Sequence, residues 1–164
     1  MKNKDILELL EKIQTQKELK KRFQTLLIDV LDLRSNPLHP LVFVNGTPHI
    51  GKHVYIGLFS EVNAQSSDVF IGDHCDISSF VAINCADSHQ LCIGHSETID
   101  RKPIVIEHHV FVGSHSVIKG GAHIGHHCVI SAGTIVDGQT IAPYSLVSGN
   151  PMKIKAGYYQ NDQT

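Results

Sequence analysis

Aliphatic residues return at every sixth position along the second half of the chain, with polar residues and glycines between them. The unbroken series is Ile106, Val112, Ile118, Ile124, Ile130 and Val136. The positions four places after each of these hold mostly small residues: Val110, Ser116, Ala122, Cys128, Thr134 and Thr140. A helix would return apolar residues at three and four positions and a strand at two, so this period fits neither element. It indicates an internal repeat.

Two earlier blocks follow the same rule, and a slip of three residues near Asp68 separates them. Their aliphatic residues are Ile50, Ile56 and Val62 in the first block and Ile71, Ile77 and Ile83 in the second. Each hexapeptide is predicted to form one short strand and one turn, with its aliphatic side chain pointing inward. Three hexapeptides then close a triangular coil of eighteen residues, and successive coils stack.

Stacking makes residues eighteen positions apart into neighbours, at the strand spacing of about 4.8 Å. We therefore expect Ile106 beside Ile124 and Val112 beside Ile130 in continuous aliphatic ladders. Each fully buried aliphatic contributes about 1.5–3 kcal/mol, which a single coil cannot collect because its inner face needs neighbours. The expected fold class is an all-β solenoid. Glycines follow the aliphatic residue where the chain bends tightly: Gly51, Gly57, Gly72, Gly113 and Gly125.

Two regions lie outside the repeat. Residues 3–33 carry apolar residues at helical spacing, which predicts one or two helices packed on the prism and ended by Ser35-Asn36-Pro37. Residues 88–103 (SHQLCIGHSETIDRKP) are polar and break the period, so they should form a loop thrown out from the coil, where chemistry is commonly placed. We expect an N-terminal helical segment at 1–36, a β-helix domain at 37–157 and a C-terminal tail at 158–164.

Composition narrows the function classes. Since 41% of the residues are hydrophobic, the chain can bury a hydrophobic core. Its formal charge of -2 gives no positive electrostatic potential that would attract a polyanion. The basic excess within residues 1–22 fits a solvated helix face, and no nucleic-acid partner is expected. Acidic residues interrupt the start of the chain where a signal peptide needs an apolar stretch, and no apolar run reaches a membrane-spanning length. We expect a cytoplasmic protein without membrane insertion. The four cysteines lack CxxC spacing, which argues against a disulfide framework or a structural zinc site.

Several segments together resemble the hexapeptide-repeat, left-handed β-helix acyltransferases, over about residues 50–155. They are Val110-Phe111-Val112-Gly113-Ser114-His115, Ser131-Ala132-Gly133-Thr134, and the ending YSLVSGNPMKI at 144–154. Left-handedness is implied by the resemblance alone, since parallel crossovers are in general right-handed. The galactoside and maltose acetyltransferases are the relatives with the matching segments.

This resemblance implies a general base at His89, because a histidine opens the corresponding loop in those enzymes. An imidazole titrates near neutral pH and suits the removal of a proton from a sugar hydroxyl or amine as it attacks an acyl-CoA thioester. The backbone N–H of Ser114 is implied as the donor to the oxyanion. Asn84, Asp87 and Asn63 are candidate substrate-binding residues near this base, although capping of the turns explains all three equally well.

The resemblance also implies acetyl-CoA as the co-substrate. The residues expected along the pantetheine arm are Phe111, Gly113, Ser131, Ala132 and Gly133. Lys153 and Lys155 are candidates for the CoA phosphates, with a solvated tail as the alternative for Lys153. The chain departs from many relatives by reading Val136-Asp137-Gly138-Gln139 where they carry a lysine, which puts a phosphate contact there in doubt.

The expected function is CoA-dependent transfer of an acetyl group to a sugar, specifically a nucleotide-linked amino sugar used for lipopolysaccharide or capsule. We expect a homotrimer with acyl-CoA in the groove between subunits, and no metal. One alternative is a zinc enzyme like the γ-carbonic anhydrases, because His108 and His109 should stack on His126 and His127. Three converging ligands are needed for such a site, and exposed turn histidines are the simpler interpretation. The other alternative is a non-catalytic trimerisation module.

Overall fold

A computed structural model describes residues 3–30, 38 and 41–160 of the chain, without the side chain of Ile28. The chain divides into two compact units, residues 1–40 and 41–164, and each is described by itself. The predicted helix end at Ser35-Asn36-Pro37 lies outside the described residues.

The first unit is a pair of helices, α1 (Asn3–Thr15) and α2 (Lys17–Val30), which pack against each other. Gln16 is the single residue between the two helices. Its N–H donates to Lys12 O in α1, and its carbonyl accepts from the N–H of Lys20 in α2. Ile13 is buried, while Leu7 and Leu26 are exposed. The predicted helical segment is confirmed, and its packing on the repeat domain stays a prediction. None of the helices in the described part of the chain has the length and apolarity to cross a bilayer.

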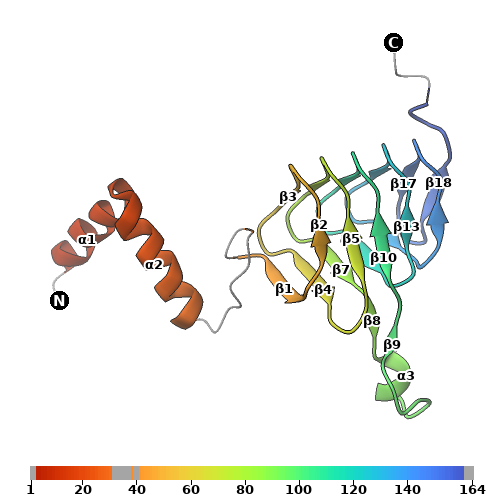
Figure 1. Cartoon of the computed structure of the whole chain (residues 1–164), viewed down its shortest axis with the longest axis horizontal. Helices are drawn as coiled ribbons and strands as arrows, with labels where there is room; N and C mark the ends of the chain where they lie inside the picture. The colour runs from red at the N-terminus through yellow and green to blue at the C-terminus, as the bar shows by residue number, and fades with distance from the viewer. Residues whose placement is uncertain (1–2, 31–37, 39–40, 161–164) are drawn as a thin grey trace. The chain divides into compact units, whose positions relative to one another are not determined.

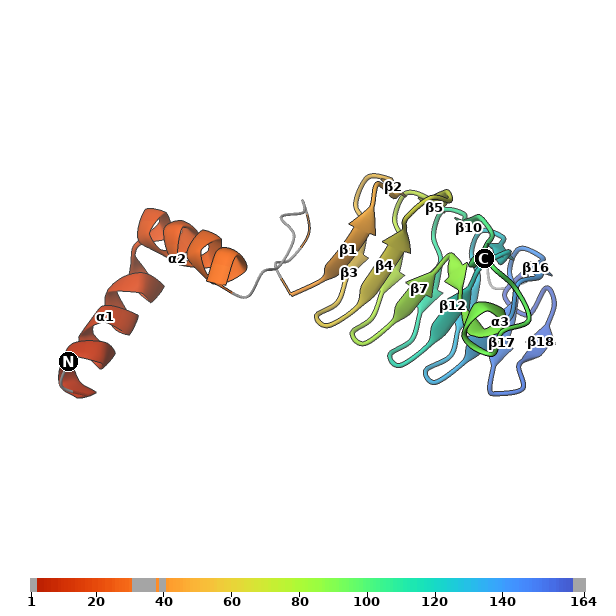
Figure 2. The same cartoon turned by 90° about the horizontal axis from the view of Figure 1, so that it is seen from below.

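The second unit is a solenoid whose strands form three parallel sheets, one on each side of a triangular prism (Figures 1 and 2). The first sheet contains β1 (Phe43–Gly46), β4 (Glu61–Ala64), β7 (Ala82–Asn84), β12 (Val117–Lys119) and β15 (Ile135–Val136). The second contains β2 (His49–Ile50), β5 (Val69–Ile71), β10 (Ile104–Ile106), β13 (His123–Ile124) and β16 (Thr140–Ile141). The third contains β3 (Tyr55–Ile56), β6 (Asp76–Ile77), β11 (Phe111–Val112), β14 (Val129–Ile130) and β17 (Leu146–Ser148), and β18 (Lys153–Lys155) pairs antiparallel at its edge.

The strand register confirms the eighteen-residue coil. Ile106 pairs with Ile124 and Val112 with Ile130, as the period predicts. Val62 pairs with Ile83 instead, which is twenty-one positions on. The slip near Asp68 is therefore a coil with three extra residues, which lengthen one corner rather than shift an aliphatic out of the core. The solenoid is consistent with the left-handed β-helix that the resemblance implies.

Inward aliphatic residues and small corner residues together fill the prism. The aliphatic ladder residues from Ile71 to Val147 are at most 1% exposed, and the corner residues Cys75, Ala122 and Cys128 are equally buried. A Cβ on Gly113 would lie 2.4 Å from the backbone nitrogen of Ala132 on the next coil, which no side chain tolerates. Glycine at this position is thus required by coil spacing, whatever role it has toward a ligand.

A ladder of rings follows the edge between the second and third sheets. His53, His74, His109, His127 and Tyr144 all have positive φ, from 55° to 59°, and each ring stacks on the next at 4.8–5.0 Å. His108 also stacks on His126 at 5.0 Å, so the predicted stacking of the two histidine pairs is confirmed. Histidine is among the few non-glycine residues enriched in this left-handed conformation. In the described residues, no three or more His, Cys, Asp or Glu side chains are arranged to hold one metal ion.

The ring ladder predicts a pH-dependent stability. Burial, and then the charges of His109, His126 and His108, lower the pKa of His127 below its ordinary 6.5. The unfolded chain therefore binds more protons just below pH 6.5, so the free energy of unfolding should fall as the pH drops through this value. Asp87 and Glu107, whose pKa values are also lowered, lose their contribution only below about 3.8 and 4.5.

Thermal unfolding between pH 7.5 and 5.5 measures this effect, and His127→Asn is the matched variant because asparagine accepts the left-handed backbone. Between pH 7.5 and 5.5, the unfolding temperature of the variant should fall by less than that of the wild type. An identical pH dependence in both proteins would contradict a role for His127.

Candidate active site

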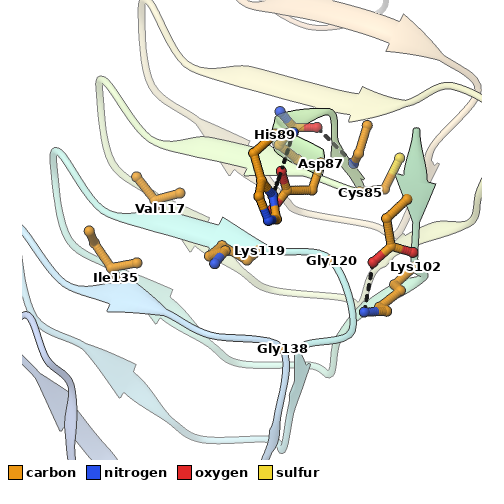
Figure 3. Close-up of a pocket in the computed structure, with 12 residues that line it drawn as sticks. Cys85, Asp87, His89, Lys102, Val117, Lys119, Gly120, Ile135 and Gly138 are labelled. Carbon is orange, nitrogen blue, oxygen red and sulfur yellow. Dashed lines mark hydrogen bonds and ion pairs between the residues drawn. The ribbon is translucent and has the colours of Figure 1, made fainter. Parts of the chain in front are cut away.

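A cleft of about 640 Å³ lies where a hairpin leaves the solenoid beside the first sheet (Figure 3). Its lining residues are Asn84, Cys85, Ala86, Asp87, His89, Asp100, Lys102, Val117, Lys119, Gly120, Ile135 and Gly138. The hairpin pairs β8 (Ala86–Asp87) with β9 (Asp100–Arg101), and the short helix α3 (His89–Cys92) lies between these strands. The irregular segment that the sequence predicts as a loop therefore forms one wall of the cleft.

The hairpin is fixed to the coil at its base. Cys85 N–H donates to Asn63 O, and the chain rejoins the coil where Lys102 N–H donates to Cys85 O at 2.9 Å. Arg101 Nη1 donates to Gln65 O at 2.6 Å, which ties β9 to the corner of the preceding coil. The residues at the start of the hairpin are thus held by the scaffold, while α3 buries none of its residues.

His89 and Asp87 form a close pair in the cleft (Figure 3). His89 Nδ1 lies 2.5 Å from Asp87 Oδ1, and the backbone N–H of His89 donates to the same oxygen at 3.1 Å. The hydrogen bond from the His89 side chain, followed by that from its backbone, lowers the pKa of Asp87. The ionised carboxylate only accepts hydrogen bonds, so we assign the ring proton to Nδ1. The lone pair of a neutral His89 is then on Nε2.

Gln90 covers this lone pair. Its Nε2 lies 2.7 Å from His89 Nε2, so the amide N–H donates to the ring. The backbone carbonyl of Gln90 accepts from the N–H groups of His95 and Ser96, which holds the main chain but leaves the exposed side chain able to turn away. A substrate hydroxyl or amine can take its place on His89 Nε2.

Asparagine side chains form a column on the outer face of the first sheet and lead to the cleft. Asn63 lies in register with Asn84, and its amide N–H donates to Asn84 Oδ1 at 3.1 Å. Each of the two also caps the turn after its strand, because Asn63 Oδ1 accepts from Gln65 N–H and Asn84 Oδ1 from Ala86 N–H. Asn84 lines the cleft, whereas Asn63 is not among the lining residues. Asn63 and Asn84 therefore both cap turns, and their binding of substrate stays a prediction.

Two lysines line the cleft, and each has an acidic neighbour. Lys102 Nζ lies 2.8 Å from Asp100 Oδ2, and this hydrogen bond raises the pKa of Lys102. Lys119 Nζ lies 3.3 Å from Asp137 Oδ1 in a looser pair. The sequence reasoning missed Asp100, Lys102 and Lys119. Lys119 was detectable as the residue after a core aliphatic in the same coil position as Asn84, but Asp100 and Lys102 lie in a segment without any period.

None of the cysteines has the surroundings of a nucleophile. Burial raises the pKa of the Cys75 and Cys128 thiols, which makes these two corner residues poor nucleophiles. Cys85 lines the cleft but is 1% exposed, and Cys92 is an exposed residue of α3.

Five of the remaining predicted site residues lie at the corner that precedes the strands of the first sheet. Gly113 and Ser114 follow β11, and Ser131, Ala132 and Gly133 occupy the same corner one coil later, where Gly133 N–H donates to Ser114 O. This corner precedes β12 and β15, whereas the cleft runs along these strands from Val117 and Ile135 to the turns at Gly120 and Gly138. Ser114 and Ala132 are not among the lining residues, although Val117 and Ile135, which follow them by three positions, are. The cleft that holds His89 therefore does not include Ser114.

Phe111, Lys153 and Lys155 also lie away from the cleft, on the third sheet. Phe111 is on β11 and is 40% exposed on the outer face. The two lysines are exposed on β18, where Lys155 Nζ lies 5.5 Å from the centre of the Tyr158 ring. Their expected contacts with CoA stay predictions.

The chain is similar in sequence to known acyltransferases. The family described as "Hexapeptide repeat of succinyl-transferase" matches residues 103–137. A 2,3,4,5-tetrahydropyridine-2,6-dicarboxylate N-succinyltransferase of Xylella fastidiosa (strain 9a5c) is 28% identical over 129 residues, which cover 70% of this chain and 42% of that protein. The galactoside O-acetyltransferase of Escherichia coli (strain K12) is 32% identical over 119 residues, covering 70% of this chain and 57% of that protein. The chain thus spans about half the length of the curated relatives it matches.

A solved structure gives the same result for the fold. A galactoside acetyltransferase in complex with coenzyme A superposes with a TM-score of 0.66 at 25% identity, over 96% of this chain and 81% of that one. Together with the parallel strand register, these matches confirm the resemblance to the hexapeptide-repeat acyltransferases.

Proposed function

We propose that the chain is a CoA-dependent acetyltransferase that acts on a sugar, with His89 as the general base. The observation that carries this proposal is the His89–Asp87 pair in an open cleft, where Asp87 fixes the ring proton on Nδ1 and leaves Nε2 to accept. The relatives named above transfer acetyl or succinyl groups, and one solved neighbour holds coenzyme A.

The reaction follows from these groups. An acceptor hydroxyl or amine replaces Gln90 on His89 Nε2 and gives up its proton there as its oxygen or nitrogen attacks the thioester carbon of acetyl-CoA. Asp87 stabilises the imidazolium that forms, and a backbone N–H, for which Ser114 is the candidate, stabilises the tetrahedral oxyanion. Collapse of the intermediate breaks the carbon–sulfur bond, and the imidazolium returns its proton to the thiolate of CoA. No covalent enzyme intermediate is needed.

We further propose that a second copy of the chain completes the site. Since His89 and Ser114 lie on opposite edges of the first sheet, the cleft edge of one chain must face the Ser114 edge of another for both to act on one thioester. A cyclic trimer satisfies this with one groove per pair of neighbours, and Ser131, Ala132 and Gly133 then line the same groove as Ser114. A nucleotide-linked amino sugar for surface polysaccharide remains our candidate acceptor.

Acetyl-CoA binding and turnover test the proposal. Release of CoA is measured with a panel of nucleotide-linked amino sugars and free galactosides, and thermal unfolding is followed with and without acetyl-CoA. At a hundred times its dissociation constant a ligand adds about 2.7 kcal/mol, which corresponds to an increase of about 5–10 °C in the unfolding midpoint for a domain of this size. A non-catalytic module would show neither CoA release nor this shift.

A further inference from the structure

The polar column on the outer face of the first sheet ends in two hydrogen-bond donors on neighbouring strands. Asn84 on β7 lies in register with Lys119 on β12. Asn84 Oδ1 already accepts two hydrogen bonds, from Asn63 Nδ2 at 3.1 Å and from Ala86 N–H at 2.9 Å. The Asn84 oxygen is thus occupied, and its Nδ2 group is the donor that remains beside the strand that carries Lys119.

Neither donor can satisfy the other, since an amide N–H and an ammonium group both lack an acceptor. In the described part of the chain, Asn84 Nδ2 makes no hydrogen bond, and Lys119 Nζ makes its one hydrogen bond to Asp137, at 3.3 Å. After the hydrogen bonds and charge of His89, the Lys119 charge also lowers the pKa of Asp87. The side chains of Lys119 and Asp137 are 46% and 58% exposed. Exposed ion pairs of this kind contribute little free energy, so Lys119 can exchange Asp137 for another anion.

Both donors line the cleft that holds the proposed base. Figure 3 labels Lys119 and His89 in this cleft. The other charged groups of the cleft are paired more closely: Asp87 with His89 at 2.5 Å, and Lys102 with Asp100 at 2.8 Å. Lys119 is therefore the cleft cation with the loosest partner, and the neighbouring Asn84 amide adds a second donor to the same spot.

We propose that Asn84 and Lys119 bind an anionic oxygen of the acceptor substrate, so the acceptor is a sugar that bears a carboxylate or a phosphate close to the group that is acylated. This inference rests on the proposed acyl transfer and adds to it the charge of the acceptor. Lys119 acts on acceptor binding and takes no part in the proton transfer.

Matched acceptors and variants test this proposal. Amino sugars that differ only in being neutral, in bearing a carboxylate or in bearing a phosphate are compared by CoA release, with KM and kcat measured separately. We expect the wild type to prefer one of the anionic forms. Lys119→Met should raise the KM for that form by about 10–100-fold, which is the effect of losing a hydrogen bond to a charged group. The kcat for the anionic form and the turnover of the neutral form should change little. Lys119→Arg should keep the preference, and Lys52→Met, which removes an exposed ammonium on another coil, should behave as wild type.

The binding of the same sugars, measured by calorimetry without acetyl-CoA, separates the two proposals. Weaker binding of the anionic sugars to Lys119→Met without any CoA release by the wild type would keep the anion subsite and contradict acyl transfer. Equal turnover and binding of neutral and anionic sugars by the wild type would overturn the subsite, as would an equal loss on all sugars in Lys119→Met. The preferred anion identifies the acceptor as carboxylate or phosphate.

Discussion

Replacing His89 by alanine is expected to lower turnover by about 10²–10⁴-fold, the range typical for loss of a general base. The loss should appear in kcat with acetyl-CoA binding unchanged, because His89 lies on the edge of the first sheet opposite the expected cofactor residues. Steady-state rates of CoA release measure this effect. An amine acceptor in its neutral form needs less help from a base, so the loss should be smaller for N-acetylation than for O-acetylation.

His95→Ala is the matched control for this variant. His95 is an exposed histidine of the same hairpin and is not among the residues that line the cleft. Its replacement should leave turnover within about twofold, as for other surface substitutions away from a site. If His89→Ala kept wild-type turnover with a hydroxyl acceptor, His89 would have no part in the mechanism.

Mixing two inactive variants is expected to restore activity. His89→Ala removes the base from the cleft edge of a chain, and Ala132→Arg places a large cation on the opposite edge, where the exposed Ala132 is proposed to contact acetyl-CoA. Each variant alone should be inactive. In randomly mixed trimers made at equal amounts, both edges of a groove are intact in about a quarter of the grooves, so about a quarter of wild-type activity should return.

Refolding from a mixture, or co-expression of the two variants, followed by the CoA-release assay measures this recovery. The size of each variant in solution, checked by light scattering, is the control for assembly. No recovery from mixtures that assemble normally would mean that one chain supplies the whole site. The proposal that neighbouring copies share it would then be wrong.

The core of the solenoid between Ile106 and Val136 follows from the sequence because one eighteen-residue rule fixes its coils. Once Ile106 and Ile124 are eighteen positions apart and must both be buried, their neighbours are placed as well, including the stacked pair His109 and His127. The three-residue slip near Asp68 was visible as a break in the period. Its place at a corner could not be read from the sequence, because an inserted segment carries no period of its own.

The candidate site was predictable only where it touches the repeat. His89 and Asp87 directly follow a core strand, so their neighbourhood could be expected. Gln90, Asp100 and Lys102 owe their positions to the hairpin, whose shape depends on its own backbone hydrogen bonds. The separation of His89 from Ser114 depends on the corner of the coil that each residue occupies. The corners could not be assigned by counting hexapeptides from His89 to Ser114, because the segment 88–103 between them has no period.

The bond between Lys102 N–H and Cys85 O closes the hairpin where it leaves the solenoid, so the coil continues as if the inserted residues were absent. Lengthening such an excursion costs little, since the entropy of closing a loop grows only slowly with its length. The wall that is proposed to contact the acceptor can therefore change in length and composition without disturbing the aliphatic ladders that hold the molecule together. If the proposed acyl transfer holds, a scaffold of this kind can acquire new acceptors by exchanging one surface excursion, while the proposed groove for the acyl donor stays the same.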